Sequence, residues 1–299
     1  MTHRLTLSTA LLLCVPPMLW AGNAVVGRMV VPLVPPMALN FLRWACAFVL
    51  LLPFAWRLLR RGSPIWPGMH RYAVLGLLGI GSYNALQYMA VRTSTPINVT
   101  LVASSMPFFM LGLGALFFHQ RITGRQLVAA ALSIAGVLVV LCRGEVKQLA
   151  HLHFVPGDLY MLLATASWSL YSWLLTRPGD PPEVRSDWAG FLVAQLVPGV
   201  AWSGLFAAAE TAVTTQQIQW GWPLAAALAY VAIGPAILAY RCWGLGVQRV
   251  GPNIAGFFSN LTPLFAALLS ATFLGEPPHL FHALAFVLIV AGIVVSSRR

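Results

Sequence analysis

The sequence predicts an all-α polytopic membrane protein, with ten transmembrane helices arranged as two inverted five-helix repeats. Three observations predict this fold class. The chain is 59% hydrophobic and only 8% charged, it divides into long apolar segments, and one of its stretches occurs twice. A soluble domain usually carries about 25% charged residues. No soluble fold of 299 residues could hide so much apolar side chain, so the class must be a membrane protein.

The apolar segments are mostly close to the ~20 residues that a helix needs to cross ~30 Å of hydrocarbon. They are roughly Leu5–Val26, Met37–Trp56, Tyr72–Val91, Ile97–Phe118, Leu127–Leu141, Gly157–Leu175, Trp188–Ala209, Trp222–Gly246, Asn253–Leu274 and Leu280–Val295. We expect the first segment to be a span and not a cleaved signal peptide, because its loss would remove Trp20, a repeat partner of Trp168.

The repeated stretch reads P-I-N-V-T-L-V-A-S-S-M-P at Pro96–Pro107 and P-N-I-A-G-F-F-S-N-L-T-P at Pro252–Pro263, which is an offset of 156 positions. The second proline of each copy, Pro107 and Pro263, falls about the middle of an apolar segment. Proline there removes a backbone donor and bends or breaks the helix. Broken helices at matching positions of two halves point to a transport site.

The repeat divides the chain into residues 1–145 and 146–299, with five spans in each half. Because five is an odd number, the second half enters the membrane from the side opposite to the first. The two halves are therefore predicted to be inverted relative to each other. Inverted repeats provide two near-equivalent shapes, which is the physical basis of alternating access.

The net charge of +11 is explained by topology and not by a nucleic-acid partner. With the N-terminus inside, twelve basic residues fall on the cytoplasmic side: Arg4, Arg57, Arg60, Arg61, Arg71, Arg121, Arg125, Arg177, Arg185, Arg249, Arg298 and Arg299. Four fall outside: Arg28, Arg92, Arg143 and Lys147. This excess obeys the positive-inside rule, so both termini are predicted to be cytoplasmic.

The chain resembles the EamA family of the drug/metabolite transporter superfamily over nearly its whole length. The likeness is carried by W-A-G-N near Trp20, F-L-R-W around Arg43, the small-residue third segment, the stretches of Pro107 and Pro263, and F-L-G-E at Phe273–Glu276. The resemblance implies a central cavity lined mainly by spans one, three, four, six, eight and nine. It implies an exporter of amino acids or other small metabolites, most similar to bacterial exporters of aromatic and other amino acids. One departure is Gln120, where the family usually has glutamate.

Aromatic side chains on spans three, six and eight are candidates for the cavity wall: Tyr83, Tyr88, Trp168, Tyr171, Tyr240 and Trp243. Tyrosine and tryptophan offer an apolar face together with one hydrogen-bond donor. The alternative is an interfacial aromatic belt. Tyr83 and Trp168 sit near mid-span, where a belt does not reach, so the cavity is favoured for these two.

Polar residues within spans either bind substrate or hold helices together. Ser104 and Asn260 occupy matching repeat positions beside the predicted breaks, and Gln87 lies one turn from Tyr83. The predicted substrate site therefore comprises Tyr83, Gln87, Ser104, Trp168, Tyr171, Tyr240, Trp243 and Asn260.

Arg43 and Arg241 are charged residues within spans, where charge is costly and usually faces a cavity or a partner. Arg43 is either an anchor for a substrate carboxylate or a structural hub near a helix break. We favour the hub, because the family tends to have arginine here although its substrates differ. Arg241 lies nearer the cytoplasmic end, from where its side chain can snorkel to the interface.

No proton carrier stands out, because the acids lie at span ends or in loops: Glu145, Asp158, Asp180, Glu183, Asp187, Glu210 and Glu276. A proton-coupled carrier usually buries a carboxylate or histidine. We therefore predict a secondary transporter of the bacterial inner membrane that acts as a monomer, without obligatory proton coupling, cofactor or metal. The alternatives are a lipid-carrier flippase of the same fold and a membrane enzyme that acts on lipid substrates.

Overall fold

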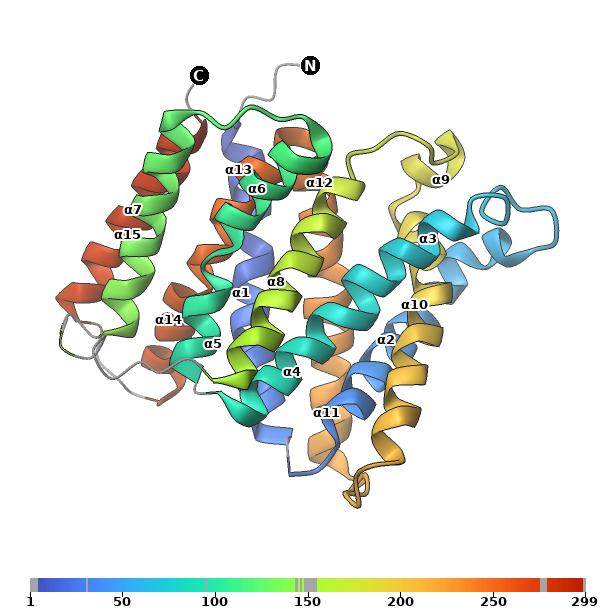
Figure 1. Cartoon of the computed structure of the whole chain (residues 1–299). Helices are drawn as coiled ribbons and strands as arrows, with labels where there is room; N and C mark the ends of the chain where they lie inside the picture. The colour runs from blue at the N-terminus through green and yellow to red at the C-terminus, as the bar shows by residue number, and fades with distance from the viewer. Residues whose placement is uncertain are drawn as a thin grey trace.

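The computed structural model describes residues 5–30, 32–94, 96–142, 145, 147, 155–274 and 279–297. Within these ranges every regular element is a helix. The helices form a bundle of long rods, and α1 begins at the same end of the bundle at which α15 ends (Figure 1). The predicted all-α class is therefore confirmed. Arg4, Arg143, Glu276, Arg298 and Arg299 lie outside the described residues.

The first half begins with two long helices and continues with rods made of shorter pieces. Its elements are α1 (Leu7–Val30), α2 (Pro36–Ala55), the 3-10 turn η1 (Trp56–Leu59), α3 (Met69–Leu75), the π-helical η2 (Gly76–Ser82), α4 (Tyr83–Thr93), α5 (Pro96–Ala103), α6 (Met106–Phe118) and α7 (Gly124–Leu141).

The second half follows the same order. Its elements are α8 (Pro156–Leu174), the short α9 (Pro182–Ser186), α10 (Trp188–Thr211), α11 (Trp222–Val231), the π-helical η4 (Ala232–Leu238), α12 (Ala239–Val250), α13 (Pro252–Phe258), the 3-10 turn η5 (Ser259–Leu261), α14 (Thr262–Leu274) and α15 (Leu280–Ser297).

The limits of several elements repeat at the offset seen in the sequence. Shifting η2, α6 and α7 by 156 positions gives the first and last residues of η4, α14 and α15. The two π-helical segments were not predicted. A π-helical insertion is rare and is found most often at functional sites. Its occurrence at matching positions shows that the two halves share local backbone irregularities as well as sequence.

The predicted helix breaks lie just before the two prolines. α5 ends at Ala103 and α6 begins at Met106, so Pro107 stands in the first turn of α6. In the second copy η5 separates α13 from α14, and Pro263 is the second residue of α14. Because the first turn of a helix contains donors without intrahelical partners, proline costs little there. The chain ends one helix and starts another at these points.

Contacts between the halves are reciprocal. α2 packs against α10, and α7 packs against α15, each pair joining corresponding helices of the two halves. α1 packs against α12 and α14 of the second half, while α8 packs against α4 and α6 of the first. Such self-complementary contacts are expected when two similar modules associate about a twofold axis.

Within the described residues, seven helical stretches are long and apolar enough to cross a membrane: Leu7–Gly27, Pro36–Leu59, Val99–Phe118, Gly124–Leu141, Trp188–Thr211, Trp222–Val250 and Leu280–Ser297. The predicted third, sixth and ninth spans are not among them. The third and sixth contain many polar and aromatic residues, which lower the mean hydropathy, and the ninth ends beside residues outside the described ranges. A multi-pass membrane protein is thus confirmed, and the count of ten spans stays a prediction.

Candidate functional site

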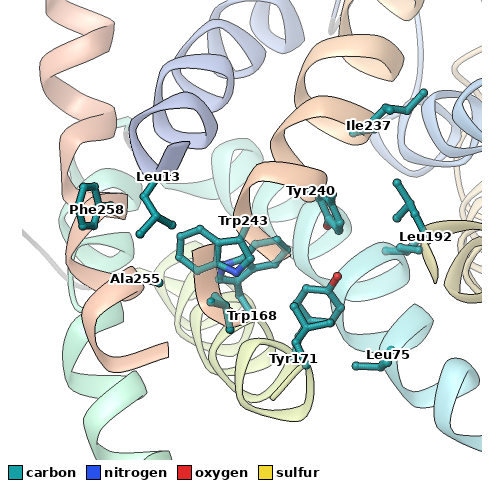
Figure 2. Packing of buried hydrophobic residues seen from close by; sticks show 14 of the residues in the cluster. Leu13, Leu75, Trp168, Tyr171, Leu192, Ile237, Tyr240, Trp243, Ala255 and Phe258 are labelled. Carbon is teal, nitrogen blue, oxygen red and sulfur yellow. The ribbon is translucent and has the colours of Figure 1, made fainter. Parts of the chain in front are cut away.

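Six rings form an aromatic cluster where α1, α4, α8 and α12 meet. At its centre lies the indole of Trp168, which is 1% exposed. The ring centroids of Trp20, Tyr83, Tyr171, Tyr240 and Trp243 lie 5.0 to 5.5 Å from that of Trp168. Figure 2 shows four of these side chains, Trp168, Tyr171, Tyr240 and Trp243, gathered at one point of the core. The structure thus brings together five of the predicted site residues.

Both halves contribute to the centre of the aromatic cluster. Trp20 on α1 and Trp168 on α8 are the residues that the sequence pairs across the repeat. Their rings meet edge to face, with an interplanar angle of 89°. Aromatic pairs in this geometry contribute about 1 kcal/mol beyond the area that they bury. A residue pair that is equivalent by repetition therefore forms a direct contact between the halves.

Three of the six side chains in the aromatic cluster donate hydrogen bonds to other parts of the protein. The Tyr171 hydroxyl donates to Gln195 Oε1 at 3.0 Å, and Trp243 Nε1 donates to Ser172 Oγ at 3.0 Å. The Tyr240 hydroxyl donates to the carbonyl oxygen of Gly79 in η2. These bonds fix the orientation of three of the rings.

The indole N–H of Trp168 differs from these three donors. It is buried and has no hydrogen-bond partner among the described residues. A buried donor without a partner costs about 1–3 kcal/mol of stability. A protein can tolerate this loss of stability at a binding site, because a bound ligand supplies the missing acceptor.

Arg43 on α2 lies beside the aromatic cluster and is 1% exposed. Its Nη1 donates to Asn84 Oδ1 at 3.0 Å and to the Tyr88 hydroxyl at 3.4 Å, and its guanidinium lies 5.0 Å from the Trp44 ring centroid. Its Nε atom has no partner among the described residues. Arg43 is therefore tied to α4 as a structural hub would be, with one donor left over.

Ser104 and Asn260 also meet, as their matching repeat positions suggest. Asn260 Nδ2 donates to the carbonyl oxygen of Ser104 at 3.3 Å and to Ser133 Oγ at 2.8 Å. One of these bonds joins the two helix breaks to each other, and the other joins the second break to α7. This contact fits the role of holding helices together better than that of binding substrate.

The remaining predicted residues occupy different surroundings. Gln87 is half-buried one turn beyond Tyr83 on α4. Within the part of the chain that the structure describes, no hydrogen bond joins its amide to the other candidates. Arg241 is exposed, and its guanidinium lies 4.4 Å from the Trp188 ring centroid. Arg241 is thus outside the aromatic cluster.

Three residues complete the site although the sequence analysis did not select them as candidates. Trp20 belongs to the cluster itself, Gln195 orients Tyr171, and the Trp44 ring centroid lies 4.8 Å from that of Tyr240. The signal for Gln195 was a single amide in an otherwise apolar span. Such a residue is expected to find a partner within the membrane, because an unpaired amide is costly there.

Comparison with known proteins gives a family match in two stretches. The model of the EamA-like transporter family matches residues 7–142 and again residues 155–298. A solved structure, described only as the crystal structure of a protein, superposes with a TM-score of 0.72 at 23% identity and covers 96% of each chain. At this identity the second likeness shows the fold alone.

Curated relatives carry transporter names. The chain is 26% identical to the uncharacterized transporter YyaM of Bacillus subtilis, over 76% of this chain and 72% of the relative. It is 27% identical to the aromatic amino acid exporter YddG of Ancylobacter novellus, over 80% of this chain and 77% of the relative. It is 26% identical to a probable amino-acid metabolite efflux pump of Salmonella typhimurium, over 71% of both.

The family model spans most of the chain. The predicted membership in this family, and the prediction of a transporter in place of an enzyme, are confirmed. The protein belongs to the EamA-like transporter family.

Proposed function

We propose that the protein is a secondary exporter of amino acids and related small metabolites, with its substrate site at the aromatic cluster. The observation that carries this proposal is the buried, unpartnered N–H of Trp168 at the junction of the two halves. The names of the amino-acid exporters among its relatives support the substrate class.

We further propose that residues 1–145 and 146–299 form two inverted five-helix repeats that exchange shapes during alternating access. The recurrence of element limits at 156 positions and the reciprocal contacts between the halves support this arrangement. Trp20 and Trp168 touch between the halves, so movement of one half against the other must alter the aromatic cluster.

The polar groups at the site favour a substrate that accepts hydrogen bonds. Trp168 Nε1 and Arg43 Nε are both donors without partners in the described residues. A carboxylate provides several acceptor positions and is attracted to a buried guanidinium. Two of the described carboxylates are buried, Asp158 in the first turn of α8 and Glu210 near the end of α10, but each accepts a hydrogen bond from a backbone N–H, of Val155 and of Met37 respectively. Transport without obligatory proton exchange is therefore proposed.

The test is counterflow in proteoliposomes over a panel of amino acids, using Trp168→Phe and, as a matched control, Trp243→Phe. Both substitutions keep one aromatic ring and remove the same part of the indole, but Trp168→Phe removes an N–H without a partner among the described residues. We expect Trp168→Phe to lower thermal stability less than Trp243→Phe does, and to weaken the apparent substrate affinity about tenfold, as for one buried hydrogen bond. Trp243→Phe removes an N–H that bonds Ser172, so we expect mainly a loss of stability.

If no amino acid exchanges, or if Trp168→Phe leaves affinity unchanged while Trp243→Phe lowers it, the site assignment is wrong. Competition by polyisoprenyl phosphates for the same site would instead support the flippase. Simultaneous recording of proton flux decides the coupling, because a proton flux strictly tied to substrate contradicts the uncoupled mechanism.

A further inference from the structure

The connection after α2 carries a group of exposed basic and aromatic side chains, which we call the Arg–Trp patch: Trp56, Arg57, Arg60, Arg61 and Trp66. The Arg60 guanidinium lies 4.3 Å from the Trp56 ring centroid, and that of Arg57 lies 6.0 Å from the same centroid. Two guanidinium groups therefore gather at one indole, which is 44% exposed.

The turn that holds the patch is ordered by its own hydrogen bonds. Trp66 Nε1 donates to the carbonyl oxygen of Arg60 at 2.9 Å, and Ser63 N donates to the same carbonyl at 3.1 Å. The patch is thus a built surface and not a set of independent side chains.

The acidic side chains of the described residues do not neutralise the positive charge of the patch. In the described part of the chain, no acidic side chain forms an ion pair with Arg57, Arg60 or Arg61. In the connection between α8 and α10, Asp180 pairs with Arg71 at 2.8 Å and with Arg185 at 2.6 Å, and Asp187 accepts a hydrogen bond from Ala189 N at 3.1 Å. Three arginines within five positions repel one another, and an external anion would relieve this repulsion.

The patch lies at the depth of lipid headgroups. The apolar stretch Pro36–Leu59 runs the length of a membrane span, and the arginines stand at its end. Tryptophan favours this interface. On the preceding turns of α2, Leu50 is 44% and Phe54 is 75% exposed. These side chains provide an apolar track for an acyl chain directly beside the arginines.

We infer that the Arg–Trp patch binds an anionic phospholipid, with the phosphodiester held by Arg57 and Arg60 and an acyl chain along Leu50 and Phe54. Arginine presents a planar fork that binds two phosphate oxygens at once. The positive-inside arrangement places this lipid in the cytoplasmic leaflet, where anionic lipids interact with basic residues beside a span.

The opposite end of the neighbouring helix lacks this combination. Trp220, in the connection between α10 and α11, is 69% exposed, and Trp222, the first residue of α11, is 82% exposed. The stretch 212–221 contains no basic residue. Tryptophans alone mark an interface, whereas the arginines of the patch add recognition of phosphate. The proposed phosphate contacts are therefore not reproduced at that end of α10.

The experiment titrates the purified full chain in detergent with dioleoyl phosphatidylglycerol or dioleoyl phosphatidylcholine and counts bound lipids by native mass spectrometry. Arg57→Gln/Arg60→Gln is compared with Arg121→Gln/Arg125→Gln, which removes equal charge from the connection before α7 and from the first turn of α7, on the same predicted side. We expect the first variant to bind phosphatidylglycerol about 25-fold more weakly, about fivefold for each arginine. The control should bind within about twofold of the original chain.

A second variant, Arg57→Lys/Arg60→Lys, keeps the charge and removes the guanidinium forks. Several-fold weaker binding of phosphatidylglycerol by this variant supports phosphate recognition, and it serves also if the glutamine variant is unstable. Unchanged affinity in either patch variant, an equal loss in the control, or equal affinity for phosphatidylcholine overturns the assignment. Competition by millimolar glycerophosphoglycerol, which lacks acyl chains, would show a soluble phosphate site in place of a lipid site. None of these measurements depends on transport.

Discussion

Arg43 is the residue at which structural and functional demands meet. A charged side chain inside a membrane bundle is expensive, so it persists only with partners or with a task. The structure supplies partners on α4, Asn84 and Tyr88, which supports the predicted structural role. The single unpartnered Nε leaves room for a second role as a carboxylate anchor.

Replacement of Arg43 separates these roles. We expect Arg43→Gln to lower the free energy of unfolding by about 2 kcal/mol, because hydrogen bonds of a charged donor to Asn84 and Tyr88 are lost. Thermal unfolding and size-exclusion profiles measure this effect. Arg241→Gln serves as the control, since Arg241 is exposed and should be replaceable at little cost. A stable Arg43→Gln protein with a raised substrate constant would contradict the hub and favour the anchor.

The residues of the aromatic cluster differ in how far the sequence could identify them. Trp168 could be selected because a tryptophan near mid-span is too deep for an interfacial belt. Trp20 was visible only as its repeat partner. Gln195 could not be assigned to the site from the sequence. Its role there is to accept a hydrogen bond from the Tyr171 hydroxyl, 24 positions away, and no local pattern encodes that contact.

Among the elements, α7 and α15 form the closest pair of corresponding helices. A β-carbon added at Gly136 of α7 would lie 2.9 Å from the carbonyl oxygen of Ala285, and one added at Gly292 of α15 would lie 2.8 Å from that of Ala129. Small residues allow such approach where lipid removes the hydrophobic driving force between helices. The two glycines are reciprocal, as the repeat requires.

We expect Gly136→Ala to destabilise the protein by about 1–3 kcal/mol, because the backbone of α15 has to move away from the added methyl group. Gly112→Ala on α6 is the matched control. A β-carbon there has no neighbour within 4 Å, so this change should be neutral or slightly stabilising through helix propensity. Thermal unfolding of both variants in the same detergent provides the comparison. Equal stability of the two variants would show that α7 and α15 separate without cost.

The π-helical segments show what helix prediction from sequence missed. Hydropathy and glycine content locate a third and an eighth span but do not reveal a local change in hydrogen-bond spacing. In η2, side chains of other helices bind the carbonyl groups of the π-helical turn. Ser167 Oγ donates to the carbonyl oxygen of Leu78 at 2.9 Å, and Asn40 Nδ2 donates to that of Ile80 at 3.2 Å. Because these donors come from α8 and α2, only the folded bundle stabilises the irregular backbone.

At the scale of the whole molecule, the two halves are held together at more than one level. The rings of Trp20 and Trp168 meet in the interior. Near the end of the bundle at which α3 begins, Arg71 Nε donates to Asp180 Oδ1 at 2.8 Å, and Arg185 Nη1 donates to Asp180 Oδ2 at 2.6 Å. Asp180 is 1% exposed, so this ion pair is shielded from solvent on one side. Alternating access requires contacts of this kind to exchange between two arrangements.

The inverted arrangement has a direct topological test. Reporter fusions after Gly62, after Gly179 and at the C-terminus should all report the cytoplasm, because an even number of spans separates them. Fusions after Pro35 and after Thr214 should report the outside. Alkaline phosphatase and green fluorescent protein, which are active on opposite sides, give the measurement. Termini on different faces would overturn the ten-span inverted repeat.

The sequence by itself determined the membrane class, the repeat with its offset and the family. Hydropathy, repetition and motif spacing depend on the order of residues along the chain, so they can be recognised without a structure. Only the tertiary structure decided which polar groups are satisfied. The hydrogen-bond partners of Tyr171, Tyr240 and Trp243 come from other positions along the chain. The same packing buries the indole N–H of Trp168 without an acceptor among the described residues. Hydrogen bonding between distant residues is a property of three-dimensional packing, and the proposed site depends on it.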